Sequence, residues 1–166
     1  MISEAPPENP ADDFYAPGNP FYMQTTLHAF NEAGFNFTSI QDILGIGIYI
    51  TTAVKCGKTG YTISTATIQN CSALLEVELQ LFSNIQAIII NGDVAIRSFN
   101  YITRRQSGKR VIPAGSTYKI RTESCYYHDI RVFPSYILTG QNFLIEKSKR
   151  RMISEDIQNA MKLLKL

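Results

Sequence analysis

The sequence predicts one α/β domain over residues 1–166, in which a central four-stranded parallel sheet lies between two layers of helices. Its 166 residues are 45% hydrophobic and 18% charged, which suits one buried core and leaves no room for a second full domain. Apolar, β-branched runs without polar alternation indicate strands that are covered on both faces. Helical patterns lie between these runs, and this alternation of strand and helix is typical of a parallel sheet.

The beginning of the chain predicts one strand and one helix. Residues 1–3 are typical of the end of a strand, and the Pro- and Asn-rich residues 4–20 predict a loop. Apolar side chains at helical spacing predict a helix over 21–33, followed by a short turn over 39–44 that Ser39 caps.

The middle of the chain predicts two more strands, each followed by a helix. Residues 45–56 and 85–92 are the strands, because both are apolar and β-branched. Helices are expected over 67–82 and over 94–105, the second one capped by Asp93. The side chains expected to point inward are Leu74, Leu75, Leu79, Phe82, Val94, Ile96, Phe99 and Ile102.

The last third predicts an irregular segment, a strand and a helix. Short strands are expected around Val111 and Tyr118, and residues 129–135 predict the last core strand. After a polar loop over 135–142, Ser154 with two acidic residues predicts the start or restart of a helix. The face of this helix that should point inward holds Ile157, Ala160, Met161 and Leu164.

A functional site is expected beyond the carboxyl ends of the parallel strands, where such sheets bind ligands. Glu4, Asp12 and Asp13 follow the first strand, where a carboxylate could orient or deprotonate a water, although acidic loops are commonly only solvated. Phe21 and Tyr22 come beside the same loop. An aromatic ring there could stack on a nucleobase or begin a buried helix.

The charge distribution indicates a polyanionic partner. Residues 1–83 hold two Lys against eight acidic residues, and residues 84–166 hold fourteen Lys and Arg against six, so the halves carry −6 and +8. Such clusters suit phosphate contacts, which give affinity without reading sequence, although a solvated basic face is the alternative. The basic clusters are Arg104, Arg105, Lys109 and Arg110, and then Lys147, Lys149, Arg150 and Arg151.

The location expected from the sequence is the cytoplasm. No apolar run approaches the roughly 18 to 20 residues that span a bilayer, and the start MISEAPPENP holds neither a basic nor an apolar region. Three cysteines make an odd number, which favours a reducing compartment over a disulfide framework.

Seven segments along the chain carry a family resemblance. SEAPP is similar to GEAPG or GLAPA, GNPF to GxPF, IYITTAVKC to VYITNAVKC, and INGDVAIRSF to LGDVALKAL. RVFPSYILTGQN falls where the family has a strand followed by SYHPSxQN, and CSALLEVELQLF and SKRRMISEDIQNAMKLL are similar to two of its helices. These motifs resemble those of the uracil-DNA glycosylase superfamily, especially its iron-sulfur branches.

The resemblance implies that a nucleotide is flipped into a pocket at the strand ends and that its base is excised. A water attacks the sugar carbon while the base leaves with negative charge on its O2. The candidate catalytic carboxylates are Glu4, which would hold the water, and Asp13. Phe21 would stack on the base, and Thr52 would contact its edge where one branch has an Asn.

The loop after the last strand would contact the DNA backbone near the flipped nucleotide. Ile137 falls where the family has the His that supports the leaving O2, and an isoleucine donates no hydrogen bond. The loss of one such donor costs on the order of 3 to 4 kcal/mol of barrier. The other candidate residues of this loop are Ser135, Thr139, Gln141 and Asn142.

The resemblance also implies a cysteine-ligated cluster. The cluster of the family takes four Cys, and Cys56 and Cys71 occupy the later two positions. No cofactor is expected in this chain as given, and a 4Fe-4S cluster is expected only if a segment before Met1 supplies two further Cys. Cys125 matches no ligand position and is expected to be a packed thiol.

Three functions follow from these observations. The first is excision of a deaminated base, uracil or a related one, by a monomeric protein that binds DNA through its basic second half and contacts no membrane. The second is a family member that binds nucleic acid without excision, which Ile137 favours. The third is an enzyme of free nucleosides or nucleotides, which would show little dependence on salt.

Overall fold

A five-stranded sheet with the order β2-β1-β3-β5-β4 forms the centre of the fold. The computed structural model describes residues 1–58, 60 and 62–164, except for the side chains of Gln141 and Asn142. Strands β1, β2, β3 and β5 are parallel, and β4 pairs with β5 in the antiparallel direction. The α/β class is confirmed, and the sheet has one strand more than predicted. The strands are Ile2–Ser3 (β1), Thr51–Thr52 (β2), Ala87–Asn91 (β3), Cys125–Tyr127 (β4) and Ile130–Ser135 (β5).

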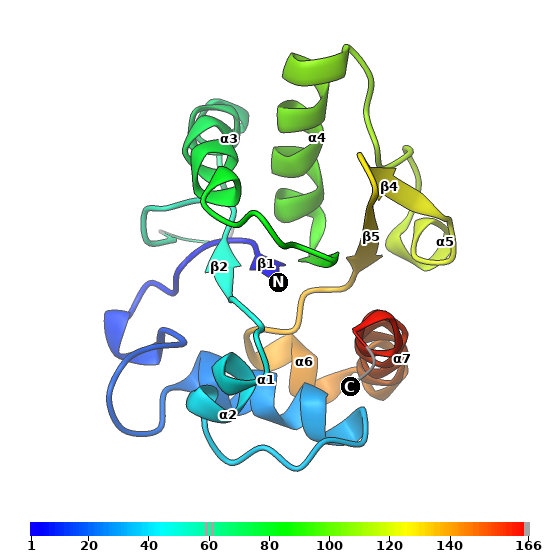
Figure 1. Cartoon of the computed structure of the whole chain (residues 1–166). Coiled ribbons are helices and arrows are strands. Elements are labelled where there is room, and N and C mark those ends of the chain that lie inside the picture. The colour runs from blue at the N-terminus through cyan, green and yellow to red at the C-terminus, as the bar shows by residue number, and fades with distance from the viewer. Residues whose placement is uncertain (59, 61, 165–166) are drawn as a thin grey trace.

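Helices cover both faces of this sheet. Figure 1 shows α3 and α4 on one side, and α1, α2, α6 and α7 on the other. None of the helices in the described part of the chain has the length and apolar character needed to cross a membrane. The helices are Phe21–Glu32 (α1), Ile40–Gly45 (α2), Thr65–Gln80 (α3), Asp93–Ser107 (α4), Thr117–Ile120 (α5), Gln141–Ile145 (α6) and Lys147–Leu163 (α7), with a 3-10 turn at Pro10–Asp12 (η1).

Side chains alternate along the strands, so each strand feeds two cores. Ile88 and Ile90 pack in the cluster that includes residues of α4, whereas Ile89 and Phe133 pack in the cluster formed with α1 and α7. Because successive side chains point to opposite faces, Asn91 at the end of β3 lies on the α1 and α7 side.

The second strand is shorter than the sequence predicts. Residues 45–56 are expected to be extended, but the ladder with β1 joins only Ile2 to Thr51 and Ser3 to Thr52. The ladder stops there because β1 itself has two residues.

Helix α3 buries fewer side chains than predicted. Leu75 is fully buried, but Leu74 is 58% exposed and Phe82 38% exposed. The helix packs mainly against α4, so its outer face meets solvent.

The segment between α4 and β5 differs most from the prediction. Val111 lies in a bend, and Tyr118 lies in helix α5 with its side chain 65% exposed. The strand in this segment is β4, in which Cys125 is buried and Tyr126 exposed because one face only is covered. Its partner is β5, to which it returns after a short turn.

Helix α7 begins at Lys147, well before Ser154, and α6 lies within the predicted loop. Ser154 is buried in the middle of α7, so it caps no helix. Asp156 is buried and paired with Arg121, which explains why two acidic residues stand inside the helix. The inward face is confirmed for Ile157, Ala160 and Met161.

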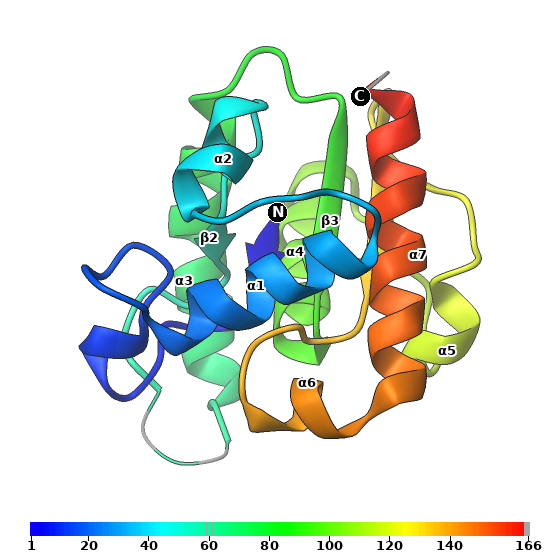
Figure 2. The same ribbon diagram turned by 90° about the horizontal axis from the view of Figure 1, so that it is seen from below.

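Four segments meet at the carboxyl edge of the parallel strands. They are the loop from β1 to α1, the loop after β2, the start of α4, and residues 136–140 between β5 and α6. Figures 1 and 2 show α6 next to α1, where the rings of Phe143 and His28 lie 5.7 Å apart. This edge therefore brings together the loops that carry most of the predicted site residues.

Candidate functional site

A row of polar side chains ends the four parallel strands. The register places Ser3 opposite Thr52 and Asn91 opposite Ser135, and β1 pairs with β3 between them. These four side chains are between 0% and 8% exposed, and by alternation they share the α1 and α7 side of the sheet. The sheet thus changes from apolar to polar at the edge where a parallel sheet binds ligands.

Two atoms of this row are buried without a hydrogen-bond partner among the described residues. They are the Ser3 Oγ and the Asn91 Oδ1, whereas the Asn91 Nδ2 donates to the Tyr136 carbonyl at 3.1 Å. A buried acceptor without a partner is unfavourable, so the row holds free hydrogen-bonding capacity. Asn91 was not among the residues predicted from sequence, although counting the register along the predicted strands would have placed it here.

Glu4 follows the row directly and reaches the start of α4. Its Oε1 accepts a hydrogen bond from the Val94 N–H at 3.1 Å. The first turn of a helix has free N–H groups and the positive end of the helix dipole, both of which favour a carboxylate. Gly92 has φ +95°, and its lack of a side chain leaves the space that the Glu4 side chain fills.

The surroundings raise the pKa of Glu4. Burial is the largest cause, and the charge of Asp93 acts in the same direction. The Val94 N–H and the cations Lys58 and Arg97 lower the pKa, but burial outweighs them. A raised pKa makes the carboxylate a stronger proton acceptor, which suits a group that activates water.

Lys58 and Arg97 are site residues that sequence reasoning missed. Lys58 lies on the loop after β2, where its backbone N–H donates to the Pro6 carbonyl at 3.2 Å. Arg97 lies one turn into α4, with its Nε 3.9 Å from an Asp93 carboxylate oxygen. Its spacing of four residues from Asp93, the predicted helix cap, is the signal that could have identified Arg97.

Two aromatic residues begin α1 beside this edge. Phe21 is half-buried and lies outside the hydrophobic core clusters and the side chains packed against them. The ring edge of Tyr22 packs on Phe14, with centroids 5.2 Å apart, and its hydroxyl lies beside that of Thr139. Thr139 is 5% exposed, so this contact between the β5–α6 loop and the start of α1 is buried.

Ser135 points into a buried ionic network. Its hydroxyl donates to the Asp156 Oδ2 at 2.6 Å, and Arg121 lies 2.7 Å from the other carboxylate oxygen. Burial raises the pKa of Asp156, while Ser135 and Arg121 oppose the shift. The Ser135 hydroxyl is fully buried and holds α7 to the sheet, so it does not present itself at the surface of this edge.

The remaining predicted residues occupy different parts of the edge. Asp13 lies on the loop before α1, where an oxygen of its carboxylate accepts the Tyr15 N–H at 3.2 Å. Thr52 is 8% exposed in the polar row, and Ile137 is half-buried on the β5–α6 loop. The side chains of Gln141 and Asn142 lie outside the described residues.

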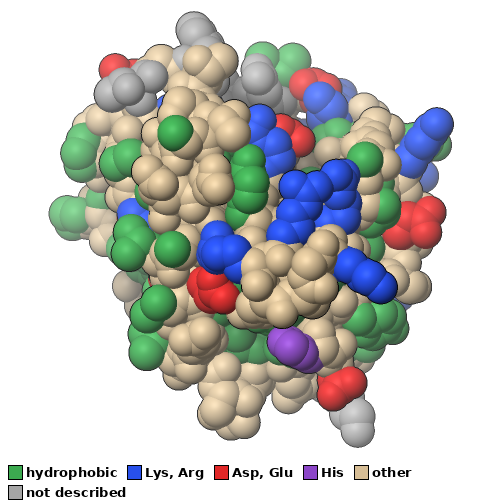
Figure 3. Space-filling view, turned by 90° about the horizontal axis from the view of Figure 1, so that it is seen from above, with side chains coloured by type: hydrophobic (Ala, Val, Ile, Leu, Met, Phe, Trp, Pro, Cys, Tyr) green, Lys and Arg blue, Asp and Glu red, His purple; other side chains and the backbone are tan. Residues whose placement is uncertain are grey.

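The two predicted basic clusters lie at different places. Arg104 and Arg105 end α4, about 20 Å along the helix from its start at the site. Figure 3 shows Lys and Arg side chains gathered over this end of the molecule, and Arg105 is paired with Glu76 at 2.6 Å. The exposed cations that follow the helix are Lys109 and Arg110.

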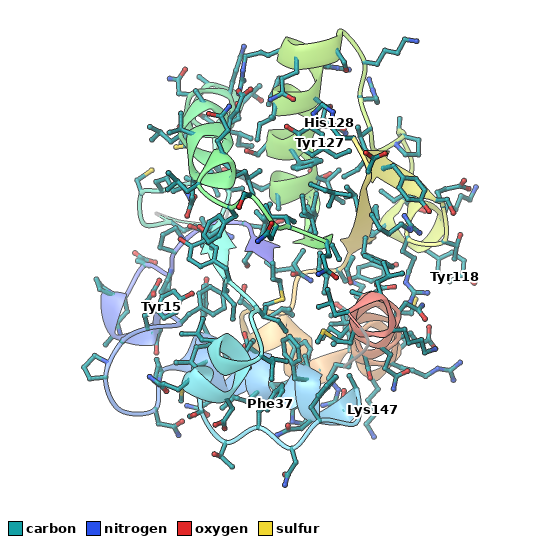
Figure 4. The ribbon with its side chains drawn as sticks, in the orientation of Figure 1. Tyr15, Phe37, Tyr118, Tyr127, His128 and Lys147 are labelled. Atoms are coloured by element: carbon teal, nitrogen blue, oxygen red, sulfur yellow. The ribbon has the colours of Figure 1, made fainter. Side chains whose placement is uncertain are left out.

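The second cluster begins α7, on the chain that leaves the carboxyl edge through α6. Three of its members are in ion pairs, of which Lys149 with Glu146 is the shortest at 2.7 Å. Lys147 is exposed, and Figure 4 labels it beside α7. The other two pairs are Arg150 with Glu32 at 3.3 Å and Arg151 with Glu155 at 3.1 Å.

The cysteines do not form a metal site within the described residues. Cys56 is exposed and Cys71 half-buried, and no group of three or more possible ligands gathers in the part of the chain that the structure describes. Two thiols do not make up a four-cysteine ligand set, so no chemistry is assigned to a cluster. Cys125 is a packed thiol, as predicted, and burial raises its pKa.

No protein-family model and no curated protein matches this chain. The arrangement of the site itself therefore has to indicate the chemistry. A half-buried carboxylate at a helix start, with cations and aromatic rings around it, is suited to holding a water against a bound planar ligand. Phosphates of that ligand would meet Lys58 and Arg97.

Proposed function

We propose that this protein is a DNA glycosylase-like hydrolase, built on the three-layer fold of the uracil-DNA glycosylase superfamily. It excises a deaminated base, uracil or a related one, from DNA. The observation that carries the proposal is the position of Glu4, a half-buried carboxylate held by the Val94 N–H at the carboxyl edge of a parallel sheet. The resemblance of seven ordered segments to that superfamily supports the same function.

The proposed reaction breaks the bond between the sugar C1′ and the base nitrogen. The electron pair of that bond leaves with the base and is shared with its O2, while the oxygen of a water forms the new bond to C1′. Glu4 orients this water and accepts its proton, and the raised pKa of Glu4 suits that role. The products are the free base and an abasic site.

The surrounding side chains would hold the nucleotide. Phe21 lies outside the core, so its ring is available to stack on the flipped base. Thr52 of the polar row offers its hydroxyl to the edge of the base, and Asn91 offers its Oδ1. Lys58 and Arg97 would neutralise the phosphates next to it, since both lie close enough to Glu4 to lower its pKa.

DNA flanking the site is proposed to follow the basic second half of the chain. The start of α7, with Lys147 and Lys149, is nearer to the carboxyl edge than the end of α4. The cluster of Arg104, Lys109 and Arg110 would then contact more distant phosphates.

A second candidate is a protein that binds DNA without excision. Ile137, half-buried on the β5–α6 loop, favours it because this side chain donates no hydrogen bond to a leaving base. The buried Ser135 hydroxyl also favours this second candidate, since it is already bound to Asp156.

Single-turnover excision assays separate the two candidates. Labelled oligonucleotides carry uracil or hypoxanthine in single strands and in duplexes, and the wild type is compared with Glu4→Gln. We expect abasic product from the wild type and a loss of at least about a hundredfold with Glu4→Gln. The matched control is Glu8→Gln, which changes an exposed carboxylate on the same loop and should leave the rate unchanged.

Two outcomes would overturn the proposal. Product formation that Glu4→Gln leaves intact would remove Glu4 from the mechanism. Salt-sensitive DNA binding without product on any substrate would assign the protein to the second candidate.

A further inference from the structure

Excision of a base requires a group that stabilises the negative charge on an oxygen of the departing base. A hydrogen-bond donor directed at that oxygen contributes about a hundredfold to a thousandfold in rate. Ile137 on the β5–α6 loop cannot act as such a donor. A hydroxyl at the carboxyl edge of the sheet could supply this missing hydrogen-bond donor.

Tyr22 brings a hydroxyl to this edge from another element. It lies in the first turn of α1 and is half-buried, and its ring is held edge-on against Phe14 at 5.2 Å. Its hydroxyl lies beside Thr139, two residues after Ile137 on the β5–α6 loop. The phenol thus lies between the loop that carries Glu4 and the loop that follows β5.

The protonation state of this phenol suits a donor. Burial has the largest effect on the pKa of Tyr22 and raises it. The hydrogen bond with Thr139 opposes this rise, and the negative charges of Glu4, Asp13 and Asp12 add to it. The ring contact with Phe14 places Tyr22 against the loop that also carries Glu4, the carboxylate that would hold the water. A phenol that keeps its proton can donate to an oxygen that gains negative charge, while the Thr139 hydroxyl orients it.

We propose that Tyr22 is the catalytic residue that donates a hydrogen bond to the oxygen of the departing base, with Thr139 as its positioning residue. This inference rests on the proposed function. No proton is transferred from Tyr22: the glycosidic electron pair moves to the base, the water oxygen bonds to C1′, and the water proton goes to Glu4. The hydrogen bond from Tyr22 strengthens as the negative charge develops.

The test compares two leaving groups in one single-stranded oligonucleotide, uracil and 5-fluorouracil, under single-turnover conditions. The 5-fluorouracil anion is the weaker base and depends less on a hydrogen bond. We expect Tyr22→Phe to slow uracil excision about a hundredfold to a thousandfold and 5-fluorouracil excision less, with the melting temperature close to that of the wild type.

Tyr118→Phe is the matched control, because Tyr118 is 65% exposed on α5, far from Tyr15 and its loop in Figure 4. It should leave both rates unchanged. Thr139→Val should reproduce part of the Tyr22→Phe pattern, with the larger loss again on uracil.

The outcomes distinguish this inference from the proposed function. An active wild type together with a Tyr22→Phe variant that keeps its uracil rate would overturn the inference alone. Equal losses on both bases would show that Tyr22 only packs against the α1 and α7 core, and would also overturn it. A wild type that releases neither base would overturn the proposed function and this inference together.

Discussion

The Glu4 side chain occupies the space into which a side chain at Gly92 would project. A Cβ built on Gly92 would lie 2.8 Å from the Glu4 Cδ, closer than carbon atoms approach in proteins. Gly92 also has φ +95°, in the left-handed region that other residues rarely adopt. The end of β3 and the carboxylate after β1 therefore constrain one another across the sheet.

Gly92→Ala should displace Glu4 and abolish excision. We expect the variant to lose roughly 1–3 kcal/mol of unfolding free energy, because it combines backbone strain with a steric overlap. Chemical denaturation and the single-turnover assay measure the two effects. Gly108→Ala is the control: residue 108 has φ +72° with no atom within 4 Å of an added Cβ, so it should lose stability and keep the excision rate.

The dependence of excision on pH should report the raised pKa of Glu4. Only the ionised carboxylate can accept the water proton, so the rate should fall as pH drops through this pKa. Since burial raises it above the ordinary value of 4.5, the fall should begin at a higher pH than for an exposed glutamate. A rate that stays level down to the ordinary glutamate range would contradict a catalytic role for Glu4.

Glu4→Gln should raise the stability of the protein near neutral pH, although it lowers the excision rate. A carboxyl whose pKa is raised on folding stabilises the folded state most when protonated, and this contribution is lost as pH rises. The neutral amide should therefore make the protein more stable than the wild type near neutral pH. The gain should shrink at acidic pH, as thermal unfolding at several pH values would show.

Arg121→Met should weaken the contact of α7 with the sheet. Arg121 neutralises Asp156, which is 3% exposed, so its removal leaves a buried charge without a cation. The expected cost is about 3–5 kcal/mol of unfolding free energy. Part of that loss should return as pH falls and Asp156 becomes protonated, whereas a loss that is independent of pH would contradict this account.

The salt dependence of DNA affinity should separate the two basic clusters. Each lost phosphate contact lowers the slope of log affinity against log salt by about 0.7 for single strands and about 0.9 for duplexes. We expect Lys58→Ala and Lys147→Ala to lower the slope for a short oligonucleotide centred on the target base. Lys109→Ala should lower this slope only for longer DNA. An equal effect on short DNA would contradict the proposed path of the DNA along the protein.

Sequence periodicity predicted the elements that local patterns determine. The buried run Ala87–Asn91, the stop at Gly92 and the amphipathic α4 were found because hydrophobic spacing and glycine are local signals. Strand β4 was missed because Cys125–Tyr127 is short and depends on its pairing with β5. Helix α7 was placed too late because the acidic residues near Ser154 resemble a helix start but serve a buried ion pair with Arg121.

The site was predictable only in part for a similar reason. Glu4 could be identified because it directly follows a predicted strand. The residue after a parallel strand lies at the carboxyl edge of the sheet, whatever the rest of the chain does. Tyr22, Arg97 and Lys58 reach the same edge from elements far apart in sequence, so their proximity depends on how those elements pack. Ser135 lies at the predicted place, but only the packing of α7 shows that its hydroxyl binds Asp156.

Single-turnover release of uracil from a labelled single-stranded oligonucleotide, by the wild type and by Glu4→Gln, decides whether Glu4 activates water for base excision. We expect an abasic product from the wild type, and a rate at least about a hundredfold lower for Glu4→Gln. Equal rates for the two proteins would contradict this expectation, as would a wild type that binds the oligonucleotide and releases no base.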